Sequence, residues 1–384
     1  GLKIILDLPA LLINLVITYL VYRGVKESKN FSNLMVWIKM FVVGLIIIVG
    51  GILIFKNDLF ANWTPDNSVG IPSFMPNGFS GVMMAVSGVF FAYIGFDAVS
   101  VMAEESKNPQ RDLPRGMIYS LVICTVVYIL LTLVLTGAAN YKAFEGIGDP
   151  LAFIFEKENL DLPWMHFLVA ICAVVAMTSV MLVFQMGQPR IWMTMSRDGL
   201  MPKRFSNIHP KFKTPSYATL VTGLVVGVPI IFTDKTFVLD FTSIGTLFAF
   251  VLVCGGVLLI PRREKEPGKF HLPYVNSKFV FPVLIAVSIF LIVTFVPGFF
   301  TETFDFSDDK IAKNIPMVVF FILIAVMLVL SFTKNLSLIP LLGLVSCCYL
   351  LTGMAVSNWM WFGVWLIIGL IFYFVYGYKN SKLN

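Results

Sequence analysis

Few ionisable side chains lie within the long apolar runs of this sequence, and chemistry is expected first at those few. Lys39 lies inside the apolar run 34–55, and Asp97 lies inside the run 81–103. A charge at membrane depth costs free energy unless it is paired or hydrated, so such residues are functional candidates. The Lys39 ammonium could occupy a cation site or exchange protons. Equally, its long side chain could extend to the nearby membrane surface.

A glycine stands among aromatic residues just before Asp97. The order is Phe90-Phe-Ala-Tyr-Ile-Gly95-Phe-Asp97. A helix that breaks at membrane depth leaves main-chain groups unpaired, and transporters use such breaks to hold the carboxylate and ammonium of a substrate. The alternative is that Gly95 only packs closely against a neighbouring helix, which is the commoner role of a lone glycine in a span.

Hydroxyl side chains at the same depth form a second group of candidates. They could coordinate an ion or a substrate, although such hydroxyls more often donate to a carbonyl of their own helix. A tyrosine in the fourth run could close a cavity. The group comprises Thr178, Ser179, Thr242, Ser243 and Thr246, together with Tyr128.

Other chemistry has weak support in this sequence. His166 lies near an external span boundary and His209 and His271 lie in cytoplasmic connections, so the three histidines form no metal cluster, and the five cysteines lie in apolar runs without metal-ligand spacing. We find no Ser-His-Asp arrangement and no phosphate-binding glycine loop. The sequence therefore predicts neither an enzyme nor a bound metal or cofactor.

Composition predicts that the elements positioning these residues are membrane spans. Hydrophobic residues make up 58% of the 384 residues and charged residues 13%, and the mean hydropathy is +0.87. Continuous apolar runs long enough to cross a bilayer as helices recur along the whole chain. We expect an all-α polytopic membrane protein with about eleven spans: 8–22, 34–55, 81–103, 117–136, 163–186, 216–232, 241–260, 279–296, 316–332, 336–355 and 360–376.

The formal charge of +6 reflects orientation rather than nucleic-acid binding. Basic residues concentrate in the connections on the cytoplasmic side of a membrane. If residue 1 lies outside, all but seven of the 28 Lys and Arg residues lie in or beside alternate connections, which are then cytoplasmic. The C-terminus is expected on that side, and the bilayer, not nucleic acid, is the expected partner.

Three motifs resemble the amino acid, polyamine and organocation transporter superfamily. Residues 90–115, FFAYIGFDAVSVMAEESKNPQRDLPR, resemble its sixth helix and the following loop. Residues 187–202, GQPRIWMTMSRDGLMP, resemble the loop after the eighth helix in its bacterial cationic amino acid transporter branch, and residues 241–263 resemble the tenth helix. The resemblance implies a LeuT-like fold of inverted repeats, with a substrate held at mid-membrane between broken helices.

The same resemblance assigns roles to individual residues. It implies that the main-chain carbonyls of Phe91, Ala92 and Ile94 face the substrate ammonium, that Gly95 permits unwinding and that Phe96 forms an aromatic gate. Lys39 matches a fifth-helix lysine that replaces a sodium ion in proton-coupled relatives. Thr178 and Ser179 fall near the eighth-helix hydroxyls beside that position.

The alignment also implies three parts of the chain. Residues 1–263 correspond to a transporter core from the family's fourth helix to its tenth, so the first three helices have no counterpart and the fold is expected to be incomplete at its N-terminus. Residues 264–335 contain two spans that resemble an insertion, and residues 336–384 resemble the final helix pair and a cytoplasmic tail.

These observations together predict a secondary active amino acid permease of a bacterial inner membrane, working by alternating access as a proton-coupled symporter. The expected partners are an amino acid, a proton and the lipid bilayer. An amino acid exchanger or a polyamine carrier is the alternative within this class. A transport-inactive scaffold or a channel-like protein is the alternative from another class, because of the unmatched first three helices.

Overall fold

The computed structural model describes residues 7–24, 29–66, 73–97, 106, 108–233, 235–260, 273–296, 298–305, 307 and 311–382, and within these ranges the chain is helical without strands. The α-helices are α1 (Leu8–Arg23), α2 (Lys29–Lys56), α3 (Gly78–Val89), α4 (Pro109–Ala138), α5 (Pro150–Phe153), α6 (Pro163–Arg197), α7 (Ser216–Phe232), α8 (Lys235–Leu259), α9 (Ser277–Phe295), α10 (Phe299–Thr303), α11 (Ile311–Lys334), α12 (Leu338–Thr352), α13 (Val356–Phe372) and α14 (Tyr378–Asn380). Shorter turns are η1 (Leu59–Trp63), η2 (Phe90–Tyr93), η4 (Tyr141–Phe144), η5 (Lys203–Ser206) and the π-helical turn η6 (Tyr373–Gly377).

The helices confirm the prediction of an all-α polytopic membrane protein. Seven of the described helices are long and apolar enough to cross a membrane. Four shorter apolar helices, Leu8–Arg23, Gly81–Tyr93, Ser216–Phe232 and Leu338–Thr352, occupy the remaining predicted spans. Each of the eleven predicted runs therefore contains a helix.

Local sequence explains where several helices begin and end. A proline stands in the first turn of α1, α4, α5 and α6, where its missing N–H has no helical partner to lose. The Asp7 carboxylate accepts the Ala10 N–H at 3.1 Å and caps α1. At the other end, Gly24 adopts φ +71°, the left-handed conformation that terminates helices.

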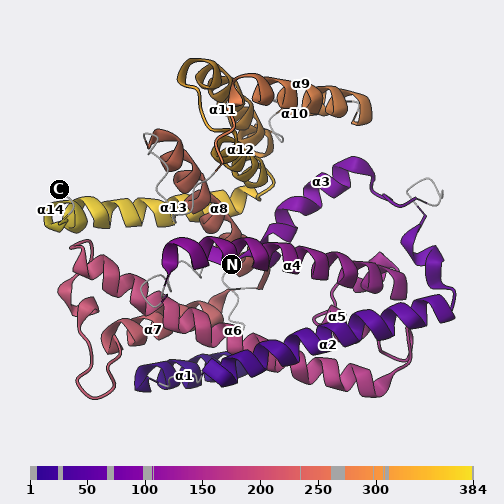
Figure 1. Cartoon of the computed structure of the whole chain (residues 1–384), viewed down its shortest axis with the longest axis horizontal. Coiled ribbons are helices and arrows are strands. Elements are labelled where there is room, and N and C mark those ends of the chain that lie inside the picture. Colours follow the sequence, from indigo (N-terminus) through magenta and orange to yellow (C-terminus); the bar gives the residue numbers. More distant parts are fainter. Residues whose placement is uncertain are drawn as a thin grey trace.

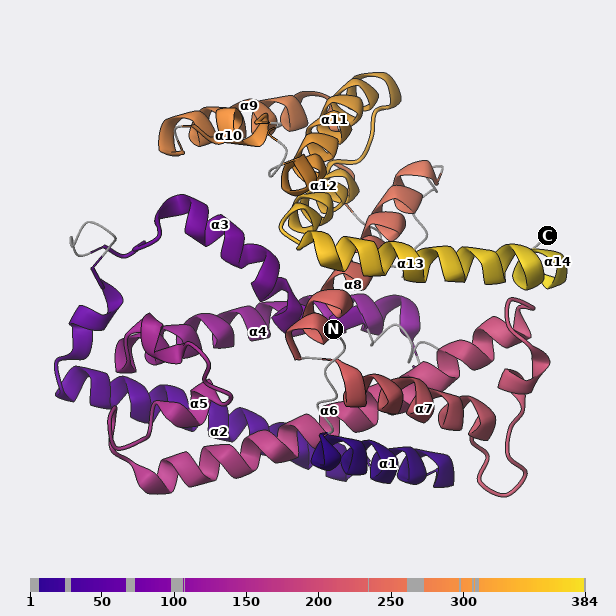
Figure 2. The ribbon, with the colours of Figure 1, turned by 180° about the vertical axis from the view of Figure 1, so that it is seen from behind.

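The helices form two groups (Figures 1 and 2). In the first, α1 packs on α6 and α7, and α2 packs on α4 and α6. In the second, α8 packs on α12 and α13, while α9 and α11 pack on each other and on α12. The third span joins them, because α3 contacts α12 and η2 contacts α8. This arrangement sets η2 at the junction of the two groups.

A close crossing of α1 and α7 stabilises the first group. Cβ atoms added at Gly223 and Gly227 of α7 would lie 2.6 Å and 2.9 Å from atoms of Thr18 and Asn14 of α1. Two small residues four positions apart allow helix backbones to approach this closely. The Asn14 amide donates to the Gly223 carbonyl at 3.0 Å, and the Gln185 amide of α6 donates to the Thr18 hydroxyl at 3.0 Å. These polar side chains are buried and link three helices.

The last described residues meet the connection after α6. The Lys382 N–H donates to the Asp198 carbonyl at 3.0 Å. The neighbouring Gly199 has φ +87°, and a Cβ there would overlap the Asn380 carbonyl. The last described residues and the 198–202 connection therefore lie at the same end of the molecule, as their shared assignment to one side of the membrane requires. Which side that is stays a prediction.

Candidate functional site

The third predicted span, 81–103, is not one continuous helix. The α-helix α3 ends at Val89, and the chain continues as the 3₁₀ turn η2. Ile94 is then extended, with φ −62° and ψ 133°, and Gly95 has φ +118°. Only glycine adopts such a φ without strain. The helix is thus interrupted at the position where unwinding was expected, and residues 98–103 lie outside the described part of the chain.

Hydrogen bonds define the path of this interrupted segment. The Ile94 N–H donates to the Phe91 carbonyl at 3.1 Å, and the Gly95 N–H donates to the Asp97 carboxylate at 3.2 Å. The Ala92 carbonyl accepts a hydrogen bond from the Tyr128 hydroxyl of α4 at 2.7 Å. A carbonyl has two lone pairs, so the Phe91 and Ala92 carbonyls each keep the capacity to accept one further hydrogen bond.

A cavity of about 540 Å³ lies between α2, the interrupted segment and α6. It brings together five of the predicted site residues, although they come from three spans. Most of the other lining side chains are apolar, including Met35, Val175 and Phe184. The predicted residues that line the cavity are Lys39, Ile94, Gly95, Thr178 and Ser179.

Lys39 is the basic residue that the described part of the chain contributes to this cavity, and it contacts one of the predicted hydroxyl residues. Its half-buried Nζ donates a hydrogen bond to the Ser179 Oγ. The Ser179 hydroxyl donates in turn to the Ala176 carbonyl of its own helix at 3.2 Å. The alternative that Lys39 only extends to the membrane surface is less favoured by this pairing, because the side chain joins α2 to α6.

The remaining predicted residues lie beside this cavity rather than in its lining. The Phe96 ring packs against Phe250 of α8, with ring centroids 5.5 Å apart. Phe91 has 38% of its surface exposed. These placements leave the aromatic gate and the carbonyl roles as predictions.

The other hydroxyl candidates bond mainly within their own helices. Thr178 donates to the Val174 carbonyl, Thr242 to that of Val238, and Ser243 to that of Leu239. These bonds match the commoner role of hydroxyls in a span, which is to donate to a carbonyl of their own helix.

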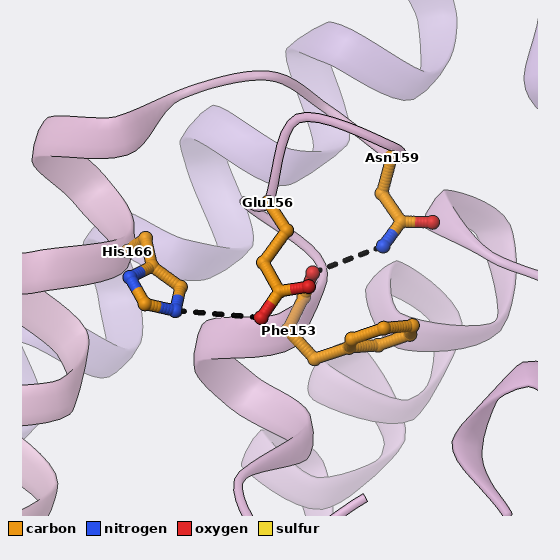
Figure 3. Close-up of polar contacts among 4 residues, drawn as sticks. All are labelled: Phe153, Glu156, Asn159 and His166. Atoms are coloured by element: carbon orange, nitrogen blue, oxygen red, sulfur yellow. Dashed lines mark hydrogen bonds and ion pairs between the residues drawn. The ribbon is translucent and has the colours of Figure 1, made fainter.

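Figure 3 shows an ion pair between a histidine and a glutamate, neither of which lines the cavity. His166 Nε2, at the start of α6, is 3.6 Å from Glu156 Oε1, and both side chains are exposed. The nearby Asn159 amide donates to the Phe153 carbonyl at 3.0 Å. Among the described residues, no three His, Cys, Asp or Glu side chains gather as metal ligands, and His271 lies outside those residues.

Sequence comparison finds a family that matches most of the chain. The profile of the family described as "Amino acid permease" matches residues 8–326, and that described as the C-terminus of these permeases matches residues 336–381.

Individual relatives are similar along nearly the whole chain. A branched-chain amino acid permease of Bacillus subtilis is 35% identical over 379 residues, which cover 98% of this chain and 65% of the relative. The methylthioribose transporter of the same species is 32% identical, with 99% and 66% covered. The mitochondrial cationic amino acid transporter 3 of Arabidopsis thaliana is 27% identical, with 100% and 70% covered. The chain thus spans slightly less than two thirds of the length of the two bacterial relatives.

Proposed function

Because the chain belongs to the amino acid permease family, a family of membrane transporters rather than enzymes, we propose that it carries an amino acid across the membrane by proton-coupled symport with alternating access. The observation that carries this proposal is the cavity that joins the interrupted third span to the Lys39–Ser179 pair. Ile94 and Gly95 of the interrupted segment and the titratable Lys39 thereby line one space, which supports a substrate site and a proton site that influence each other.

The interrupted segment would bind the ammonium group that amino acid substrates have in common. The carbonyls of Phe91, Ala92 and Ile94 are proposed to accept hydrogen bonds from the substrate ammonium, with Phe96 as the gate. Gly95 permits the conformation that exposes these groups. Main-chain dipoles at a helix break suit a polar substrate at membrane depth because they are fixed and carry no full charge of their own.

Lys39 would couple the proton to this site, with Ser179 and Thr178 as the neighbouring hydroxyls. In its charged form Lys39 donates to Ser179 and holds α2 against α6. Loss of the proton weakens that hydrogen bond, because charge-assisted hydrogen bonds are about twice as strong as neutral ones. Protonation of Lys39 would therefore strengthen the contact between α2 and α6, which borders the cavity.

The lining of the cavity favours a substrate with an uncharged side chain. No Asp or Glu is among the residues that the described part of the chain contributes to it, whereas eight of its side chains are Val, Leu, Met or Phe. A cationic side chain or a polyamine would lack a carboxylate to pair with there. Competition by leucine, valine, arginine, lysine and spermidine against labelled leucine would test this, and stronger competition by arginine than by valine would contradict it.

The main test is uptake into proteoliposomes containing the protein expressed from its whole gene. We expect an inward proton gradient to drive accumulation of the amino acid. Lys39→Met should lower gradient-driven accumulation by at least about tenfold, equivalent to ~1.4 kcal/mol. The matched control is Lys56→Met, which alters an exposed lysine at the end of the same helix.

Two results would count against the proposal in different ways. Amino acid exchange that does not depend on the proton gradient and is unchanged in Lys39→Met would show that the protein is an exchanger and not a symporter. Absence of uptake of any amino acid by folded protein would favour the scaffold or channel-like alternative. A lysine reagent that cannot cross membranes would separately test the proposed location in a bacterial inner membrane and the cytoplasmic C-terminus. The exposed Lys379 and Lys382 should react only after the cells are opened.

A further inference from the structure

Helix α4 holds the interrupted segment at two adjacent points. The Tyr128 hydroxyl donates to the Ala92 carbonyl at 2.7 Å. One helical turn earlier on α4, the Thr125 hydroxyl accepts a hydrogen bond from the Tyr93 hydroxyl at 3.3 Å. The rings of Tyr93 and Tyr128 also meet edge to face, with centroids 5.4 Å apart. Two consecutive residues of η2 are therefore fixed to the same face of α4.

The break explains why the Ala92 carbonyl needs a donor from another helix. In a continuous α-helix this carbonyl would accept the N–H of the residue four positions later, which is Phe96. Gly95, with φ +118°, turns the chain off the helical path before that residue. The Tyr128 hydroxyl supplies the hydrogen bond instead, from a half-buried position.

Resting on the function proposed above, we infer that Tyr128 is a positioning residue for substrate binding. Its hydroxyl fixes the direction of the Ala92 carbonyl, so that the second lone pair of this oxygen is presented to the substrate ammonium. Without this donor the peptide group between Ala92 and Tyr93 could rotate, and its carbonyl would turn toward other donors. Tyr128 itself need not touch the substrate.

Two substitutions separate this role from simple packing. Tyr128→Phe removes the hydroxyl but keeps the ring against Tyr93. Thr125→Val removes the other hydrogen bond between the same two elements and leaves the Ala92 carbonyl with its donor. Both variants loosen the contact between α4 and η2, but only the first alters the carbonyl proposed to bind the ammonium.

The measurement is the substrate dependence of uptake by each variant in proteoliposomes, normalised to folded protein by size-exclusion chromatography. We expect Tyr128→Phe to raise KM about fivefold, the effect of one hydrogen bond, with the maximal rate changed less than about twofold. Thr125→Val should leave KM within about twofold of the wild type. Replacing the Tyr128 hydroxyl by an amine, as in 4-aminophenylalanine, keeps an N–H donor at the same place and should recover part of the lost affinity.

The possible results distinguish this inference from the proposed function. Normal uptake by the wild type with an unchanged KM in Tyr128→Phe would overturn the positioning role alone. Equal rises of KM in Tyr128→Phe and Thr125→Val would also overturn it, since general loosening would then suffice. If the phenylalanine variant does not fold, a KM raised fivefold or more in the 4-aminophenylalanine variant would contradict the role of a donor. Absence of uptake by the wild type would instead overturn the proposed function, and this inference with it.

Discussion

Helices α3 and α6 both contain residues that weaken helices, but only the third span leaves the helical path. Helix α6 runs unbroken for 35 residues although Gly187 and Pro189 lie inside it. The third span contains Gly88 and Gly95, and its α-helix ends at Val89 after 12 residues. Proline disrupts helices more strongly than glycine does, so intrinsic preference alone would place the break in the wrong span.

The side chains that contact each span account for the difference between the continuous α6 and the interrupted third span. Pro189 is buried, and a turn earlier the Gln185 side chain is anchored to Thr18 of α1, so neighbouring helices hold α6 in its path. At Gly95, by contrast, the groups released by the break find new partners in Tyr128 and Asp97. Within a membrane a break persists only where its main-chain groups are satisfied.

The largest expected effect comes from removing the conformational freedom of the break. Gly95→Ala places a Cβ at φ +118°, where L-residues are strained. That strain is about 1–3 kcal/mol, and it should lower substrate affinity or uptake by roughly 5- to 150-fold. Uptake kinetics in proteoliposomes would measure the loss.

Gly88→Ala is the matched control within the same span. Its Cβ meets no described atom within 4 Å, and its conformation is helical. Uptake should stay within about twofold of the wild type. Equal losses in the two variants would show that the conformation of Gly95 has no special role.

A smaller effect is expected from releasing the anchor of α6. Gln185→Met keeps the length of the side chain but removes the amide that donates to Thr18. Loss of a buried hydrogen bond should lower the free energy of unfolding by about 1–3 kcal/mol, measured by thermal unfolding in detergent. Gln188→Met, one position before Pro189, has no described hydrogen bond to lose and should change stability by less than about 0.5 kcal/mol.

The smallest expected effect is a gain in stability. Gly187→Ala adds a Cβ that meets no described atom within 4 Å, in a helix that is already continuous. The better helix propensity of alanine should raise the free energy of unfolding by up to about 1 kcal/mol. A fall in the melting temperature would show that α6 needs flexibility at Gly187, and would weaken its contrast with the third span.

Apolar runs predicted the membrane helices, and the resemblance singled out five residues that line one cavity, whose roles stay predictions. The spans followed from hydrophobicity, which acts locally along the chain. The meeting of Lys39 with Ser179 was expected only through the resemblance, because nothing in either segment specifies the other. The division at residues 263 and 335 stays a prediction.

Other features could not be read from the sequence because they depend on which side chains meet. Tyr128 was a candidate for closing a cavity, which stays a prediction, and the hydrogen bond from its hydroxyl to Ala92 had no signal in the sequence. The polar contact between Gln185 and Thr18 had no signal beyond an amide in an apolar run. A polar residue in a span indicates that a partner exists, but the partner is known only from the packed structure.

The contact between Lys382 and Asp198 has a consequence for biogenesis. The connection after α6 leaves the ribosome long before the residues that bind it, so it must wait for the whole second group of helices to be synthesised and inserted. Such non-local contacts form late and leave earlier segments exposed in the meantime. During synthesis the 198–202 connection therefore lacks this partner until residues 380–382 have been made and docked.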